Sequence, residues 1–525
     1  MRYFNTTGPC DPELHYMVPA IERLPQARQY ITFGQYFVVH APRQTGKTTT
    51  LAALARQLTS EGEYLALHFS CEVAESAGAD YARAERAILD RIRRAAEIAR
   101  LPAELMPPSP WPESEPGTML GNGLAAWVEQ CPRRLVLFFD EIDAVRDASL
   151  ISVLRQLRDG FTMNRRGFVH SVVLCGLRDV RDYKAASGGD PTRLGTAGPF
   201  NIKVKSFRIG DFTRDEVATL YGQHTAESGQ EFTSRTIDLA FHYSQGQPWL
   251  VNALAAETTI EMQVATSITE EHIEIAKERL ILARATHLDS LAARLAEPRV
   301  RRVIEPLLAG GSLAGGAEYD EAVSYVRDLG LITSGNPVRI ANPIYHEVIA
   351  RVLTTNIERD VLAEPSSFRF ADGRLDMRKL LDEFASFWKL NGDSIAAKQD
   401  YHEIAPHLIF MAFLQRVVNG GGYVDREYGV GRGRIDLLVR QPYTGTDGIR
   451  REQREAIELK IWPDKQADPV ADGAVQLGAY LDLLELQSGT LVIFDRRTDA
   501  ASIVERTRFD VITTPGGHTV TLLRA

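Results

Sequence analysis

The chain has 525 residues, of which 44 % are hydrophobic and 25 % are charged, and its formal net charge is −9. This length exceeds what one hydrophobic core supports, so we expect roughly three or four modules. No apolar run approaches a membrane span, no signal peptide opens the chain, and the four scattered cysteines lack C-x-x-C spacing. These features argue against zinc and a membrane partner and predict a cytoplasmic protein. The acidic balance argues against nucleic acid coating the whole surface, but it leaves room for a local basic groove.

The first motif with a chemical meaning predicts a phosphate-binding loop. Residues 36–39 form an apolar run typical of a buried strand, and an Ala/Leu-rich helix is expected over residues 47–58. Between them stands Arg43-Gln44-Thr45-Gly46-Lys47-Thr48-Thr49. Backbone N–H groups of such a loop and the helix N-terminus bind phosphate oxygens. Lys47 is expected to reach the β- and γ-phosphates of ATP, and the Thr48 hydroxyl to ligate Mg²⁺.

One position departs from the pattern G-x-x-x-x-G-K-S/T, because Ala41 stands where the first glycine is usual. A methyl group is tolerable there if the backbone φ is negative. We therefore predict a modified loop that still binds nucleotide. The alternative is a chance Gly-Lys-Thr sequence at a helix start.

A second acidic motif supports the nucleotide interpretation. Residues 135–139 are five apolar residues, as a buried parallel strand requires, and Asp140 and Glu141 follow directly. Open α/β sheets bind ligands at the carboxyl ends of their strands. Asp140 suits a contact to Mg²⁺ through water, and Glu141 suits orienting or deprotonating the attacking water. The alternative is an acidic pair that caps a helix, a role that Asp143 also fits.

Two further residues are candidates for contacting the nucleotide. Arg178 follows an apolar strand at residues 171–176 and is positioned to sense the γ-phosphate; its alternative role is a surface salt bridge. From residue 212 the pattern becomes helical, and Gly246-Gln247-Pro248 opens one helix. A fixed proline in a helical lid can pack on the adenine, so Pro248 is predicted to line the nucleotide site.

Residues 298–353 have the pattern of a winged helix. Short helices are expected at residues 300–308, 319–329 and 345–353, with a hairpin between residues 331–333 and 338–340 around Ser334-Gly335-Asn336-Pro337. A module of this kind binds DNA or caps a neighbouring domain. The presumed recognition helix carries a single basic residue, Arg327, which favours the capping role.

The C-terminal part contains a second array of charged residues. Asp436 lies in one predicted strand, and Glu458 and Lys460 lie two residues apart in the next, so the latter two share a strand face. Two carboxylates offer oxygen ligands for Mg²⁺, and Lys460 can hold and activate a water beside the ion. Gln476 and Tyr480, one helical turn apart, can line the same cleft, and Glu403 is a candidate third carboxylate. The alternative is an amphipathic strand with a solvated Glu–Lys pair.

The nucleotide motifs and the winged-helix pattern resemble the STAND branch of the AAA+ ATPases. Residues 366–525 resemble the PD-(D/E)XK nuclease superfamily through Asp436, Glu458, Lys460 and Gln476. The resemblance implies a multidomain α/β fold with a P-loop AAA+ core (residues 1–205), a helical lid (206–295), a winged helix (296–355) and a restriction-endonuclease-like domain (366–525). It also implies an ATP- and Mg²⁺-dependent switch that regulates DNA cutting, with defence against phage or mobile DNA as one role.

Three functions remain open from the sequence. The first is an ATP-gated, Mg²⁺-dependent nuclease acting on DNA. The second is an ATPase switch whose inactive C-terminal domain binds DNA or a protein partner, and the third is a regulatory signalling scaffold. Asp436, Glu458 and Lys460 distinguish the first from the others. Homo-oligomerisation or an activating partner protein is compatible with each.

Overall fold

The computed structural model describes residues 2–163, 165–177, 203–283, 286–308, 320–358, 368–396, 405–418, 422–430, 433–445 and 447–525. The chain divides into two compact units. The first comprises Met1–His287 with Val323–Ser334, and the second comprises Leu288–Ala322 with Gly335–Ala525. Within the described ranges, no helix combines the length and apolar character needed to cross a membrane.

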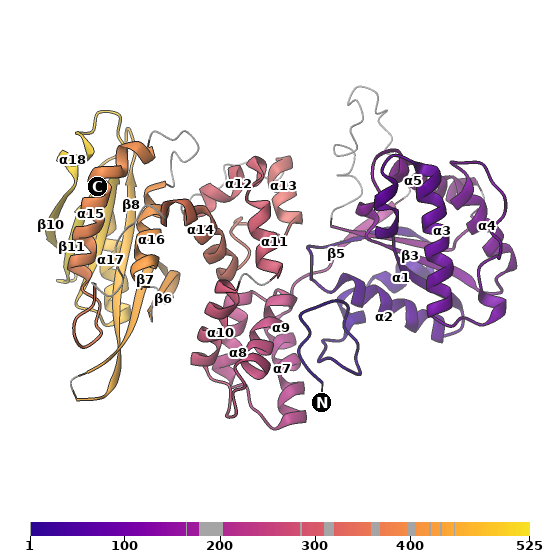
Figure 1. The fold of residues 1–525 in the computed structure, drawn as a ribbon, viewed down its shortest axis with the longest axis horizontal. Coiled ribbons are helices and arrows are strands. Elements are labelled where there is room, and N and C mark those ends of the chain that lie inside the picture. Colours follow the sequence, from indigo (N-terminus) through magenta and orange to yellow (C-terminus); the bar gives the residue numbers. More distant parts are fainter. Residues whose placement is uncertain are drawn as a thin grey trace. The chain divides into compact units, whose positions relative to one another are not determined.

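The first unit contains a five-stranded parallel sheet in the order β2-β3-β4-β1-β5. Figure 1 labels two of its strands, β3 and β5, and the helices α1 to α5 of the same unit. Its strands are β1 (Tyr36–His40), β2 (Tyr64–Ser70), β3 (Arg134–Asp140), β4 (Ser171–Gly176) and β5 (Lys203–Arg208). Every neighbouring pair is parallel. The carboxyl ends of β1 and β3 therefore lie at the same sheet edge, with β4 between them.

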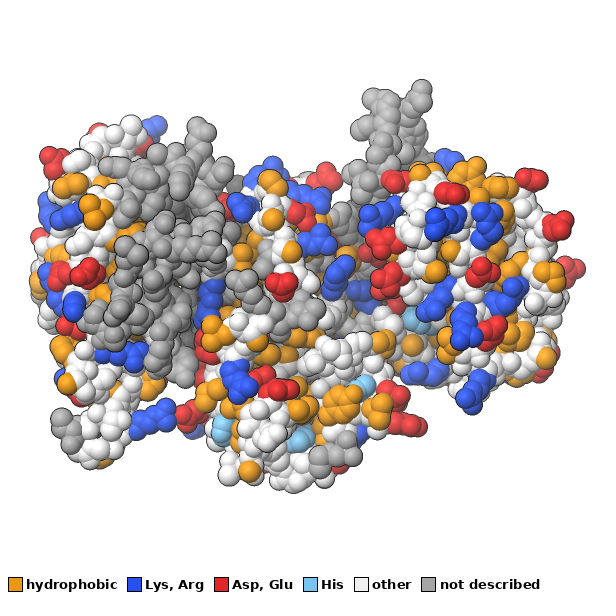
Figure 2. All heavy atoms as spheres, in the orientation of Figure 1, with side chains coloured by type: hydrophobic (Ala, Val, Ile, Leu, Met, Phe, Trp, Pro, Cys, Tyr) orange, Lys and Arg blue, Asp and Glu red, His pale blue; other side chains and the backbone are white. Residues whose placement is uncertain are grey.

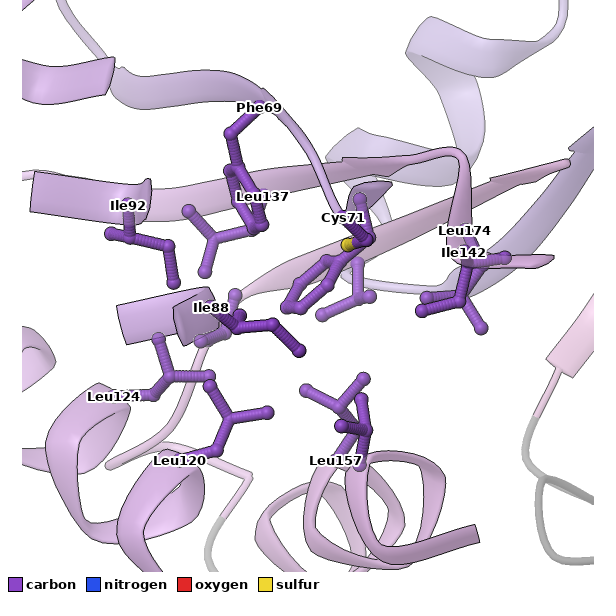
Figure 3. Packing of buried hydrophobic residues seen from close by; sticks show 14 of the residues in the cluster. Phe69, Cys71, Ile88, Ile92, Leu120, Leu124, Leu137, Ile142, Leu157 and Leu174 are labelled. Carbon is purple, nitrogen blue, oxygen red and sulfur yellow. The ribbon is translucent and has the colours of Figure 1, made fainter. Parts of the chain in front are cut away.

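Both faces of this sheet are covered, which explains the continuous apolar strands. Alternate strand residues pack on α1 (Ala27–Thr32) and α2 (Lys47–Ser60) on one face. The others pack on α3 (Tyr81–Ile98), α4 (Met119–Gln130) and α5 (Asp147–Met163). Figure 3 shows Leu137 and Leu174 of the sheet pointing toward Ile88, Leu120 and Leu157 of these helices. The core is thus a three-layer α/β/α sandwich that holds the strand ends rigidly.

The segment before β1 forms two short helical elements instead of one continuous helix. It contains a 3-10 turn, η1 (Ala20–Arg23), and then α1, separated around Pro25. Proline lacks an amide hydrogen and clashes with the preceding turn, so it ends the first element. Three further short turns complete the core: η2 (Glu72–Ala77), η3 (Ala103–Leu105) and η4 (Ile142–Ala144).

Residues 214–282 of the first unit are helical, as expected. They form α7 (Arg214–Ser228), α8 (Ser234–Ser244), α9 (Pro248–Ala256), η6 (Glu257–Glu261) and α10 (Glu270–Leu282). Gln247 caps α9 by accepting a hydrogen bond from Leu250 N at 2.6 Å, and Pro248 occupies the first turn, where a missing amide hydrogen costs nothing. Gly246 has φ +77°, and an added Cβ would lie 1.8 Å from Phe212 O, so only glycine fits.

The hairpin expected at residues 331–340 is not formed by strands. Each of its two arms contains a single bridge residue, Ile332 in one and Ile340 in the other. Pro337 cannot donate to a ladder, which shortens any pairing next to the turn. The expected helices are present as α12 (Pro298–Leu308), α13 (Glu321–Asp328) and α14 (Pro343–Glu358), and α11 (Thr286–Arg294) precedes them.

The second unit contains a six-stranded mixed sheet in the order β10-β11-β9-β8-β7-β6. Its strands are β6 (Tyr423–Val430), β7 (Gly433–Thr444), β8 (Arg450–Trp462), β9 (Ser488–Asp495), β10 (Arg508–Thr513) and β11 (Thr519–Arg524). One face packs on α17 (Val470–Leu484). Phe494 of β9 packs on aromatic side chains of α15 (Met377–Ala396), which also contact α16 (Ala405–Val418). A short α18 (Ile503–Arg506) precedes β10.

Gly246 provides a test of the lid geometry. We expect Gly246→Ala to destabilise the first unit by at least about 3 kcal/mol, because the methyl group meets the Phe212 carbonyl and φ is positive. The measurement is the midpoint of unfolding in urea. Gly229→Ala is the matched control, because Gly229 also has φ +77° but an added Cβ there meets nothing within 4 Å. It should cost only about 1 kcal/mol. Equal losses for the two variants would contradict the close approach.

Candidate nucleotide site and acidic cluster

The loop after β1 has the geometry that phosphate binding requires. Gln44 and Gly46 adopt positive φ angles of 57° and 84°, which turn the chain sharply into α2. Lys47 Nζ donates hydrogen bonds to Ala41 O at 2.8 Å and Pro42 O at 2.7 Å, so its ammonium group lies inside the loop. Burial lowers the pKa of Lys47. Ala41 is fully buried and is not among the residues with positive φ, so its methyl group causes no backbone strain.

Thr48 and Asp140 meet directly although they are far apart in sequence. Thr48 Oγ1 donates to Asp140 Oδ2 at 2.7 Å, and Glu141 N donates to Asp140 Oδ1 at 2.9 Å. His68 Nε2 lies 3.0 Å from Asp140 Oδ2. Burial raises the pKa of Asp140, but the hydrogen bonds from His68 and Thr48 outweigh it and the pKa is lowered. The donor set fits a hydrated divalent cation, because a fixed carboxylate lies beside a hydroxyl oxygen that retains lone pairs.

Glu141 lies at the same edge of the sheet. Its backbone adopts the left-handed conformation, with φ 55° and ψ 38°. The Ser70 hydroxyl, at the end of the neighbouring strand β2, donates to Glu141 Oε2. The register pairs Ser70 with Asp140, which explains why a residue 71 positions away reaches this carboxylate. His68 and Ser70 were not predicted from sequence, since only the strand register brings them to the acidic pair.

A cavity adjoins the phosphate-binding loop within the first unit. The predicted residues Gln44, Gly46, Thr49 and Pro248 all line it. Its apolar wall is formed by Met17, Val18, Ala20, Phe212, Leu220 and Trp249. Thr49 Oγ1 accepts a hydrogen bond from Cys10 N at 3.0 Å, and Trp249 Nε1 donates to Thr6 O at 2.9 Å. The N-terminal segment, the loop and the lid thus enclose one pocket of a size and polarity suited to a nucleoside.

Three other predicted residues lie in different settings. Thr45 is buried and its hydroxyl donates to Pro42 O at 2.9 Å, which stabilises the loop. Arg43 is exposed on the loop and does not line the cavity. Arg178 lies outside the described residues, so its predicted sensing role stays a prediction.

Arg23, which sequence reasoning missed, holds the loop from the other side. Its Nη1 donates to Thr45 O at 2.6 Å, and its Nη2 donates to Gly210 O. The guanidinium lies 4.8 Å from the Phe212 ring centroid, and burial lowers its pKa. An added Cβ at Gly46 would lie 2.9 Å from Arg23 Nη1, so this glycine is required by packing as well as by φ. Arg23 therefore ties the N-terminal segment, the loop and the start of the lid together.

The second predicted cluster is assembled around β8. Glu458 and Lys460 lie on the strand face that packs on α17, as the two-residue spacing predicts. Lys460 Nζ donates to Glu458 Oε1 at 2.7 Å and to Gln476 Oε1 at 2.9 Å. Asp436 Oδ2 accepts from Leu459 N at 2.9 Å. The sequence thus identified four side chains that the fold brings together, and Gln476 in turn lies 3.5 Å from Tyr480 OH.

Glu458 is the unusual member of this cluster, because a solvated Glu–Lys pair was the alternative. Its side chain is fully buried, and Oε2 has no hydrogen-bond partner among the described residues. Burial, followed by the Asp436 carboxylate, raises its pKa from 4.5 to about 7, although Lys460 opposes the shift. Two carboxylates with one unsatisfied oxygen fit a divalent cation. No group of three metal-ligating side chains occurs within the described ranges, and Glu403 lies outside them.

The pKa of Glu458 leads to a stability prediction. A carboxyl whose pKa is raised by folding contributes stability below its unfolded pKa and loses it as pH rises through about 7. We expect Glu458→Gln, measured with EDTA, to become more stable than the wild type between about pH 5 and pH 8, by on the order of 2 kcal/mol. Urea unfolding of the second unit measures this change.

Glu452→Gln, on an exposed part of the same strand, is the matched control and should show no such trend. Millimolar Mg²⁺ should stabilise the wild type more at the higher pH, because cation binding requires the ionised carboxylate. The same pH profile in wild type and Glu458→Gln would contradict the raised pKa.

One protein family matches part of the first unit, and several solved structures are similar to this chain at low sequence identity. Residues 34–183 match the family described as AAA domain. Among solved structures, the Walker-type ATPase paby2304 of Pyrococcus abyssi is 12 % identical, with a TM-score of 0.46, and covers 66 % of this chain and 99 % of its own. Cdc6p from Pyrobaculum aerophilum is 16 % identical, with a TM-score of 0.34, and covers 67 % of this chain and 97 % of its own.

The RuvB Holliday junction branch migration motor of Thermotoga maritima is 13 % identical, with a TM-score of 0.33, and covers 62 % of this chain and 92 % of its own. No curated protein matches the sequence. The family match spans the loop at Lys47 and the strand that ends at Asp140. Residues 34–183 are therefore similar to an AAA domain, the P-loop ATPase module, and this match lies within the first unit.

Proposed function

We propose that this ATPase is a nucleotide-controlled switch whose C-terminal α/β domain is a Mg²⁺-dependent nuclease acting on DNA. The observation that carries the nuclease part is the buried Glu458 carboxylate, which lies near Asp436 and has one oxygen without a hydrogen-bond partner in the part of the chain that the structure describes. Burying a carboxylate without a full set of partners lowers the free energy of unfolding. A bound cation would offset this cost, because it would neutralise the charge of Asp436 and Glu458. Lys460 and Gln476, hydrogen-bonded beside it, supply the remaining polar groups of a hydrolytic site.

In the nucleotide site, different residues would bind the phosphates, hold the metal ion and activate the attacking water. Lys47, whose ammonium lies inside the loop, and the loop amides would hold the β- and γ-phosphates, and Thr48 and Asp140, which lie in hydrogen-bond contact, would hold the hydrated Mg²⁺. The ion, when bound, neutralises charge on the phosphates. Glu141 orients the attacking water and accepts its proton, and Ser70 holds the Glu141 carboxylate until that step.

In the C-terminal cluster, Asp436 and Glu458 would hold the ion, which stabilises charge at the scissile phosphate. Lys460 Nζ is fixed between Glu458 and Gln476, where it can orient a water toward the phosphodiester. On the face drawn in Figure 2, Lys and Arg side chains are interspersed with Asp and Glu. This mixture argues against DNA binding over the whole of this face.

A contact inside the first unit supports control by nucleotide. Gly330, just after α13, has φ +78°, and an added Cβ would lie 2.6 Å from Pro42 Cγ in the phosphate-binding loop. The segment Val323–Ser334 belongs to this unit, and the chain then continues into the second unit. We propose that this segment, part of the predicted winged helix at residues 296–355, changes its packing on the loop with the bound nucleotide. Because the chain continues from it into the second unit, this change would link the nucleotide to the C-terminal domain. A role in defence against phage or mobile DNA is consistent with such a switch.

Glu141→Gln tests the ATPase assignment of roles. The variant keeps the Asp140 contacts and loses the base, so we expect unchanged ATP binding and hydrolysis slower by at least about tenfold. Calorimetric titration and phosphate release measure the two properties. Glu72→Gln, an exposed acid two residues after Ser70, is the control and should hydrolyse ATP normally. Wild-type turnover in Glu141→Gln would assign the base to another residue.

The nuclease proposal is tested on plasmid and linear DNA with Mg²⁺. We expect nicking that falls by at least about a hundredfold in Asp436→Ala, Glu458→Ala and Lys460→Ala. Asp510→Ala, an exposed carboxylate on β10, is the matched control and should cut normally. DNA binding without cleavage in the wild type would favour an inactive domain that binds DNA, and cleavage that survives in Asp436→Ala would point to another site.

The coupling is tested in the same assay with ATP, ADP or no nucleotide. Cleavage by the wild type should depend on the nucleotide, and Lys47→Ala should remove that dependence because it abolishes tight binding. Gly330→Val should change the dependence without removing cleavage, because its side chain meets Pro42. Equal cleavage in all nucleotide states would mean two independent enzymes on one chain.

A further inference from the structure

The cavity beside the phosphate-binding loop contains two buried polar atoms that the proposed roles do not use. Asn252 Oδ1 and Thr50 Oγ1 both lack a hydrogen-bond partner among the described residues. Asn252 is 8 % exposed and Thr50 is 1 % exposed, and both residues line the cavity. They come from different elements, Thr50 from α2 and Asn252 from α9. Unpaired buried polar atoms are rare in folded proteins, so two in one cavity indicate a ligand that pairs with them.

The orientation of the Asn252 amide is determined by its neighbour. Asn252 Nδ2 donates to Pro248 O at 2.8 Å. A carbonyl oxygen only accepts hydrogen bonds, so the nitrogen must face Pro248 and the oxygen must face away from it. Pro248 and Asn252 are four residues apart in α9 and therefore lie on the same side of the helix. The side chain therefore holds its oxygen, a hydrogen-bond acceptor, in a fixed orientation on the side away from Pro248 O.

The rest of the cavity suits a flat ring attached to a phosphorylated sugar. Gln44, Gly46 and Thr49 of the loop and the start of α2 form one wall, and Pro248 and Trp249 form another. Met17, Val18 and Ala20 add apolar surface. A nucleotide whose phosphates occupy the loop thus extends its base toward α9, where Asn252 lies.

We propose that Asn252 selects the nucleobase, its Oδ1 accepting a hydrogen bond from the exocyclic amine of adenine. A 6-oxopurine such as guanine or hypoxanthine presents an oxygen at that position. Two acceptors would then face each other in a buried site, and neither could be hydrated. A site built to bond a donor rejects analogues that lack it far more strongly than an apolar pocket does. Because no water reaches Oδ1, entry of the base requires a small displacement of the side chains that close over it.

This inference deepens the nucleotide site of the ATPase and does not depend on the nuclease proposal. The test compares equilibrium binding of ATP, inosine triphosphate and purine riboside triphosphate to the full chain by calorimetry. Inosine triphosphate replaces the amine by an oxygen, and purine riboside triphosphate lacks the substituent. We expect the wild type to bind ATP at least about tenfold more tightly than either analogue.

Asn252→Ala should bring the affinities for ATP and inosine triphosphate to within about threefold of each other, mainly by weakening ATP. Asn5→Ala is the matched control. Asn5 lines the same cavity, but its Nδ2 donates to Gly8 O and its Oδ1 accepts from Thr7 N. Any loss of affinity in this variant should be equal for the two nucleotides, so their ratio should stay at the wild-type value.

Equal affinity of the wild type for ATP and inosine triphosphate would overturn the proposal, as would a wild-type ratio in Asn252→Ala. If Asn252→Ala does not fold, the wild type decides the matter, because purine riboside triphosphate binding as tightly as ATP would exclude a bond to the amine. If Asn252→Ala binds ATP and inosine triphosphate with similar affinity and still binds both tightly, the proposal is supported and the phosphate-binding part of the site is intact. Absence of binding by every nucleotide would instead contradict the roles of Lys47 and the loop.

Discussion

The hydrogen bond from Thr48, in the first turn of α2, to Asp140, at the end of β3, joins residues that lie 92 positions apart in sequence. β4 separates β1 from β3 and ends in small residues, Cys175 and Gly176. Ala41 N, just after β1, donates to Gly176 O at 3.4 Å, so the start of the loop is hydrogen-bonded to the middle strand. A bulky side chain at this strand end would push the loop away from the acidic pair. The sheet order, more than any single contact, therefore determines whether a cation can reach both Thr48 and Asp140.

Asp140 and Glu458 are two buried carboxylates that compensate differently for the cost of burying charge. Asp140 accepts hydrogen bonds from Thr48 and the Glu141 amide, with His68 beside it, and its pKa is lowered. The Glu458 carboxylate accepts from Lys460, its Oε2 has no hydrogen-bond partner among the described residues, and its pKa is raised. The first carboxylate is stabilised as an anion by the fold alone. The second gains most from a cation, and this difference makes the C-terminal cluster more than an ordinary ion pair.

Sequence reasoning predicted the structural features that depend on local residue pattern. It missed the contacts that depend on strand register and on packing between segments distant in sequence. The structure confirms the strand, loop and helix around Lys47 and the apolar strand before Asp140. These elements were predictable because a continuous apolar run, or a Gly-Lys-Thr turn after such a run, adopts few other conformations. Arg23 was missed because its hydrogen-bond partners, Thr45 O and Gly210 O, lie far away in sequence and come within reach only through tertiary packing. His68 and Ser70 were missed because their partners lie on the neighbouring strand.

The C-terminal unit illustrates the same limit. The period of two correctly assigned Glu458 and Lys460 to one face, but it did not show that α17 would cover that face. Burial of Glu458 is a property of the three layers together. The hairpin β10–β11 turns at Pro515-Gly516-Gly517, and its register is regular from Arg508–Arg524 to Thr513–Thr519. Tertiary packing, which local sequence does not encode, therefore determines the electrostatics of this cluster.

A switch needs elements whose contacts with the nucleotide site differ between states, since a ligand shifts an equilibrium only through its differential affinity. Two segments distant in sequence meet the phosphate-binding loop here, Arg23 at Thr45 and Gly330 at Pro42. Arg23 also donates to Gly210 O, just before the lid helices. Each contact involves a backbone carbonyl or a close approach that tolerates little movement. A phosphate that draws Lys47 away from Ala41 O and Pro42 O would alter the same stretch of chain on which Gly330 packs. Binding or loss of a phosphate in this loop would therefore change how Gly330 and its neighbours pack on the loop.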